Sequence, residues 1–109
     1  MIVYFSYPYS DAPIKRTLEV LDKIVKLLKK RRDINPIVPH FIDLLHGFPK
    51  GYESSKLLED EIHLITISDA LCHFEEYSAG VLWEIAIARF FKIPVVTYKE
   101  LLEGWEKDE

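Results

Sequence analysis

The fold is decided by residues 70–98, which read ALCHFEEYSAGVLWEIAIARFFKIPVVTY. The apolar run at 70–74 is typical of a buried strand. Ser78 then suits the N-cap of a helix, and Pro94 separates that helix from a second β-rich run at 95–98. The apolar side chains of the helix recur at helical spacing, at Val81, Ile85, Ala88 and Phe91. The stretch therefore predicts two parallel strands joined by a crossover helix.

The same alternation of strands and helices extends in both directions from this unit. Short β-rich runs at residues 2–5 and 37–38 predict two further strands, and residues 53–67 have the apolar spacing of a helix. Residues 99–105 predict a short closing helix, whereas residues 41–51 show no period and predict an irregular loop that forms a wall or lid of a site.

The clearest helix begins near Ile14 and ends before Asn35-Pro36. Its core-facing stripe is predicted from four- and three-residue steps, at Ile14, Leu18, Leu21, Val25 and Leu28. Charged residues on the other face predict the ion pairs Glu19/Lys23 and Asp22/Lys26.

These elements predict an α/β fold, a three-layer Rossmann- or flavodoxin-like domain that spans residues 1–109 as a single unit. Its small, mostly parallel sheet has the expected strand order 2-1-3-4. Ligands bind such sheets at the carboxyl ends of the strands, where the winding direction switches. We therefore expect residues 6–13 and 75–80 to converge on one crevice.

Composition narrows the function classes. Hydrophobic residues make up 49% and charged residues 29% of the chain, which is typical of a globular protein, and no apolar stretch is long enough to span a bilayer. The net charge of -4 argues against a nucleic-acid partner. The cluster Lys26, Lys29, Lys30, Arg31 and Arg32 is interpreted as a solvated helix end. A single cysteine, Cys72, and no recognisable signal peptide favour the cytoplasm.

Glu84 is the strongest candidate for chemistry. It lies in the first two turns of the helix that begins at the crevice, between apolar neighbours, so it either points to solvent or occupies a partly buried site. Helical geometry places it on one face with Gly80, Val81 and Ala88. Ser78 and Gly80 mark a helix N-terminus that could hold an anion, although capping alone also explains Ser78.

Several short motifs, taken in order, resemble the nucleoside 2-deoxyribosyltransferase-like family, which includes the 2'-deoxynucleoside 5'-monophosphate N-glycosidases. They are Val3-Tyr4-Phe5-Ser6 with Pro8-Tyr9-Ser10, Pro39-His40, Ser68-Asp69-Ala70-Leu71, and Ser78-x-Gly80-Val81-x-x-Glu84. The resemblance covers nearly the whole chain.

The resemblance implies roles for particular residues. Glu84 matches the family nucleophile, which attacks the anomeric carbon of a deoxyribosyl group, and Tyr4 matches the tyrosine that orients it. Ser78 and Gly80 match positions that hold a 5'-phosphate. The second carboxyl group of the family falls at Glu61 or the adjacent Asp60, and both remain open because either could instead belong to a solvated helix face.

Further residues are expected to contact the substrate. They are Ser6, Tyr7, Pro8, Tyr9, Ser10, His40 and Asp69. The opening loop lacks the glycine-rich turn of the monophosphate hydrolases, so its tyrosines could instead stack on a nucleobase or serve as lid or interface residues. The histidines and Cys72 lack the spacing of zinc ligands, so we expect no metal and no cofactor, with His63 and His73 structural.

The sequence thus predicts an N-glycosidase or deoxyribosyl transferase that acts on a 2'-deoxynucleoside or its 5'-monophosphate. A non-catalytic nucleotide-binding module of the same fold is the alternative, and a small scaffold protein is a third reading, because exposed aromatic residues can mark an interface. The expected partners are a small nucleoside or nucleotide and further copies of the chain, in a homodimer or higher oligomer. No membrane partner is expected.

Overall fold

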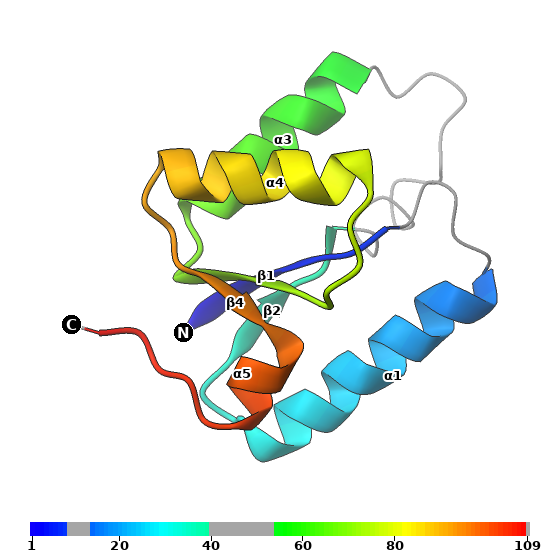
Figure 1. The fold of residues 1–109 in the computed structure, drawn as a ribbon, viewed down its shortest axis with the longest axis vertical. Coiled ribbons are helices and arrows are strands. Elements are labelled where there is room, and N and C mark those ends of the chain that lie inside the picture. Colours follow the sequence, from blue (N-terminus) through cyan, green and yellow to red (C-terminus); the bar gives the residue numbers. More distant parts are fainter. Residues whose placement is uncertain (9–13, 40–53, 109) are drawn as a thin grey trace.

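The computed structural model describes residues 1–8, 14–39 and 54–108 (Figure 1). The predicted loop at 41–51 lies outside these residues. In chain order the elements are β1 (Ile2–Ser6), α1 (Ile14–Lys30), β2 (Asn35–Ile37), α3 (Ser54–Thr66), β3 (Ala70–His73), α4 (Ala79–Phe90), β4 (Val95–Thr97) and α5 (Tyr98–Leu102).

The four strands form one parallel sheet in the order β2-β1-β3-β4, which confirms the predicted order. Strands β1 and β3 occupy the centre, with Tyr4 paired to Leu71 and Ser6 to His73 in register. Helices α3 and α4 cover one face and α1 and α5 cover the other (Figure 1). The predicted three-layer architecture is therefore confirmed.

Strand alternation sorts the central side chains into two cores. On the α1/α5 face Val3 and Phe5 pack with Val20, Ile24, Leu27 and Leu101. On the α3/α4 face Tyr4 and Leu71 pack with Ile65, Val81, Ile85 and Ala88. Because both faces are covered, the central strands are apolar at nearly every position, as parallel sheets usually are.

All four strands end at residues other than those predicted, β1 and β3 by a single residue, and the differences at β2 and β4 have clear causes. Strand β2 covers Asn35–Ile37 rather than 37–38, since Asn35 N–H donates to the Met1 carbonyl at 2.7 Å. Pro36 is tolerated because β2 is an edge strand. Strand β4 ends at Thr97, whose side chain accepts from Glu100 N–H while Glu100 accepts from Thr97 N–H. This capping box makes Tyr98 the first residue of α5 rather than the last of the strand.

The predicted core stripe of α1 is wrong at Leu18 and Val25, whereas Leu28 of that stripe packs against the core. The helix buries Val20, Ile24 and Leu27, while Leu18 is 60% and Val25 50% exposed. Both rows have three- and four-residue spacing, so periodicity alone does not distinguish them. The predicted Asp22–Lys26 ion pair is present at 2.8 Å.

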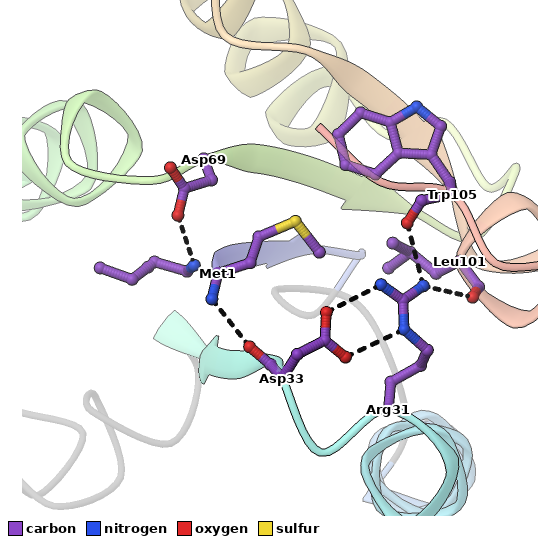
Figure 2. A network of polar contacts seen from close by, with 7 residues as sticks. Met1, Arg31, Asp33, Asp69, Leu101 and Trp105 are labelled. Atoms are coloured by element: carbon purple, nitrogen blue, oxygen red, sulfur yellow. Dashed lines mark hydrogen bonds and ion pairs between the residues drawn. The ribbon is translucent and has the colours of Figure 1, made fainter. Parts of the chain in front are cut away.

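The prediction that Arg31 is a solvated helix end is also wrong. Its side chain is 12% exposed and forms a fork with both carboxylate oxygens of Asp33, at 3.1 and 2.9 Å. One guanidinium nitrogen also donates to the carbonyls of Leu101 and Trp105, each at 3.0 Å (Figure 2). Arg31 therefore ties the end of α1 to the segment that follows α5.

Among the helices of the described ranges, none is both long enough and apolar enough to cross a membrane.

Candidate functional site

Glu84 lies on the face of α4 that packs against the sheet. That face is formed by Val81, Glu84, Ile85 and Ala88, and Glu84 is only 5% exposed. Of the two orientations left open by the sequence, the structure has the inward one. Gly80, which helical geometry grouped with Glu84, is exposed instead.

The carboxyl group of Glu84 accepts hydrogen bonds from two hydroxyl groups of β1. Tyr4 Oη donates to Oε2, and Ser6 Oγ donates to Oε1 at 3.0 Å. Residues two apart on a strand project from the same face, which places both hydroxyls under α4. Each carboxyl oxygen therefore has its own donor, near the carboxyl end of β1.

Burial dominates the ionisation of Glu84 and raises its pKa to about 7. The charge of Glu61 raises the pKa further, while the hydrogen bonds from Tyr4 and Ser6 lower it. Near neutral pH the carboxyl group is therefore poised between its two protonation states.

Of the two candidates for the second carboxyl group, Glu61 faces the interior. It is 7% exposed, and its charge acts on Glu84. Asp60 is half-buried. The α3 helix, which packs beside α4 (Figure 1), thus brings a second carboxyl group toward Glu84.

At the N-terminus of α4, Ser78 Oγ accepts from Val81 N–H at 3.1 Å, so Ser78 is the N-cap as predicted. A Cβ built on Gly80 would come no closer than 3.7 Å to any atom counted, which is Ser78 Oγ. Packing therefore does not require glycine at this position.

Several residues predicted to contact the substrate are not seen next to Glu84. Tyr7 is 3% exposed and packs edge-on against Phe74, at 6.3 Å between ring centroids, in the core on the α1/α5 face. Pro8 is half-buried just beyond β1. Tyr9, Ser10 and His40 lie outside the described residues.

Asp69 lies at the opposite edge of the sheet, where the strands begin (Figure 2). One of its carboxylate oxygens accepts from Ile2 N–H at 2.7 Å, and the other binds Lys107 Nζ at 3.2 Å. The hydrogen bond from Ile2 lowers the pKa of this carboxyl group. Asp69 thus joins the starts of β1 and β3, and the structure does not bring it to Glu84.

His73 lies at the end of β3 and is 7% exposed. Its Nδ1 accepts from Glu75 N–H at 3.1 Å, and burial lowers its pKa, so the imidazole is neutral at pH 7. Cys72 is buried, which raises the pKa of its thiol. Within the described ranges no three His, Cys, Asp or Glu side chains gather as metal ligands. His63 is exposed on α3.

Sequence reasoning missed that Ser6 binds Glu84. The signal was the two-residue spacing of Tyr4 and Ser6 on a strand, which gives both hydroxyls to one face.

Replacing Glu84 with glutamine is expected to change how stability depends on pH. Because the pKa rises from 4.5 to about 7 on folding, the contribution of this group to stability is complete below pH 4.5 and is lost as the pH rises through about 7. At about 1.4 kcal/mol for each pKa unit, the loss is on the order of 3 kcal/mol. Glutamine does not titrate. The stability of Glu84→Gln relative to the wild type should therefore rise by that amount between pH 4.5 and 8.5.

Urea unfolding of both proteins at the two pH values measures this difference. Carboxyl groups that do not interact with Glu84 cancel in it, whereas the repulsion between Glu84 and Glu61 is part of the effect. An equal difference between variant and wild type at both pH values would contradict a raised pKa at Glu84.

No family model and no curated protein matches the sequence. The structure, however, is similar to that of the 2-deoxyribosyltransferase from the psychrotolerant bacterium Bacillus psychrosaccharolyticus, which is described as a biocatalyst for nucleoside synthesis. The TM-score is 0.70 at 16% sequence identity, and the match covers 89% of this chain and 71% of the bacterial one. The chain therefore has a nucleoside 2-deoxyribosyltransferase-like fold, as the resemblance in sequence predicted.

Proposed function

We propose that this protein cleaves the N-glycosidic bond of a 2'-deoxynucleoside or its 5'-monophosphate, with Glu84 as the nucleophile. The observation that supports this most directly is the buried Glu84 carboxyl group, held by the hydroxyls of Tyr4 and Ser6. A buried carboxyl group with fixed oxygens is suited to attack at a carbon, because little reorganisation is needed during the reaction.

In the proposed step, a carboxylate oxygen of Glu84 forms a bond to C1' of the sugar. The bond from C1' to the base nitrogen breaks, and the base leaves with the electron pair. A proton from the second carboxyl group neutralises the base. Water then cleaves the glycosyl ester in a hydrolase, and a second base does so in a transferase.

Glu61 is our choice for the second carboxyl group. It is buried on α3 and its charge acts on Glu84, whereas Asp60 is half-buried. The mutual repulsion of two nearby carboxylates favours a state in which one keeps a proton. The proposed roles require that proton on Glu61, so that Glu84 is ionised when it attacks.

The N-terminus of α4 is our proposed site for a 5'-phosphate. Backbone N–H groups and the helix dipole favour an anion there, and glycine at position 80 leaves the approach open. The chain shares its fold with a deoxyribosyltransferase, which is compatible with a nucleotide bound at the N-terminus of α4.

The test is to incubate the protein with each 2'-deoxynucleoside and each 5'-monophosphate and to measure free base by chromatography. We expect release from at least one of them, and ribonucleosides serve as the matched control. Adding a second base separates a transferase, which forms a new nucleoside, from a hydrolase. If no base is released but a nucleotide raises the melting temperature, the protein is the binding module considered above.

We also propose a homodimer or higher oligomer. Leu82 and Phe90 on the outer side of α4 are 54% and 80% exposed, as in a helix whose apolar side meets a partner. Sedimentation that shows only the 12.8 kDa monomer at micromolar concentration would refute it.

A further inference from the structure

We infer that Ser6 is a positioning residue that holds Oε1 of Glu84 as the attacking oxygen and releases it during the reaction, while Tyr4 keeps its hold on Oε2 throughout. This inference rests on the proposed function, because it assigns the two oxygens of the same nucleophile.

The position of Ser6 suits this role. Its side chain is the last of β1 and is 1% exposed, so its hydroxyl lies in the interior and donates to Glu84 Oε1 at 3.0 Å. Tyr4, two residues earlier, is fully buried and donates to Oε2. The carboxyl group is thus held at both oxygens by one rigid strand, which fixes its rotation.

The two hydroxyls differ in strength as donors. A phenol is more acidic than an aliphatic alcohol, so Tyr4 forms the stronger bond to a carboxylate. When one oxygen forms an ester to C1', that oxygen loses its negative charge and accepts poorly, whereas the carbonyl oxygen still accepts well. The least hydrogen-bond energy is therefore lost when Ser6, the weaker donor, loses its bond. Tyr4 then keeps its bond to the carbonyl oxygen.

In this arrangement the hydrogen bond from Ser6 is present before attack and lost afterwards. Such a bond favours the ionised form of Glu84 without stabilising the transition state. Other titratable groups on this face of the described residues are Glu61 of α3, with Asp60 beside it, and His73 of β3, which pairs in register with Ser6. They are unchanged in a Ser6 variant, so they do not obscure its effect.

The first test needs no substrate. In protein labelled with ¹³C at the glutamate carboxyl carbons, NMR titration should give a pKa for Glu84 that is higher by about 1 in Ser6→Ala than in the wild type, because a hydrogen bond to the charged form is lost. Ser68→Ala is the matched control. Ser68 is also buried, but its hydroxyl donates to the Leu64 carbonyl, so the pKa of Glu84 should stay unchanged.

The second test uses the pH dependence of base release. Ser6→Ala should release base at about the wild-type rate at pH 6, where Glu84 is mostly protonated, and about tenfold faster at pH 9, where only the wild type has the bond to lose. Tyr4→Phe should be slower at both pH values. A Ser6→Ala variant that is about tenfold slower at pH 6 and unchanged at pH 9 would overturn the inference, because the bond from Ser6 would then persist in the transition state.

An unchanged pKa of Glu84 in Ser6→Ala would also overturn it. If the pKa moves but neither the wild type nor any variant releases base, the proposed function fails, while the hold of Ser6 on the ionised carboxylate is established by the titration.

Discussion

Glu84→Gln is expected to lower the rate of base release by at least about a thousandfold while leaving the protein folded. An amide oxygen is not a competent nucleophile at C1', so the substitution removes covalent catalysis as a whole. Glutamine is nearly the same size as glutamate and keeps an oxygen that can accept from Tyr4 or Ser6. The measurement is free base released per unit time, with the thermal midpoint determined on the same samples.

The size of the loss separates a nucleophile from a residue that only positions the substrate. Loss of a positioning hydrogen bond costs about ten- to a hundredfold, which is what we expect for Tyr4→Phe. Glu103→Gln is a matched control, because Glu103 directly follows α5 and its side chain is 64% exposed. Retention by Glu84→Gln of more than about a tenth of the wild-type rate would mean that Glu84 is not the nucleophile.

The strand order could be predicted from sequence because it follows from alternation alone. Short apolar runs joined by helices leave few topologies once crossovers are right-handed. The face of α1 could not be predicted, since the rows containing Leu18 and Val20 have the same spacing. Packing against the sheet, which local sequence does not encode, buries Val20, Ile24 and Leu27.

For the candidate site, the inward orientation of Glu84 could not be settled from sequence, because a lone glutamate also suits a surface. Its burial depends on two donors that lie about eighty residues earlier, Tyr4 and Ser6. The positions of Tyr7 and Asp69, which the structure places away from Glu84, could have been predicted from the sequence. Tyr7 directly follows β1 and continues its alternation, so it projects away from the face of Tyr4, and a residue that precedes a strand, as Asp69 does, lies at the amino edge of a parallel sheet.

Loss of the Arg31 side chain is expected to reduce stability, because this side chain joins two segments that are far apart in the sequence. Its guanidinium group binds Asp33 at one end of the network and the carbonyls of Leu101 and Trp105 at the other (Figure 2). Trp105 also packs against the core on the α1/α5 face. Removing the guanidinium group therefore loosens the junction between α1 and the segment after α5, in addition to leaving two carbonyl groups without this donor.

We expect Arg31→Met to lower the free energy of unfolding by about 2 to 3 kcal/mol, because bonds from a charged donor contribute more than neutral ones. For a chain of this size that corresponds to a melting temperature lower by roughly 10 to 20 °C. Methionine retains most of the aliphatic stem, so the change isolates the loss of the charged fork. Arg32→Met is the matched control, since Arg32 is exposed. This variant should melt within about 2 °C of the wild type. Calorimetry reports both values, and equal melting temperatures for Arg31→Met and Arg32→Met would show that the network in Figure 2 does not hold the two segments together.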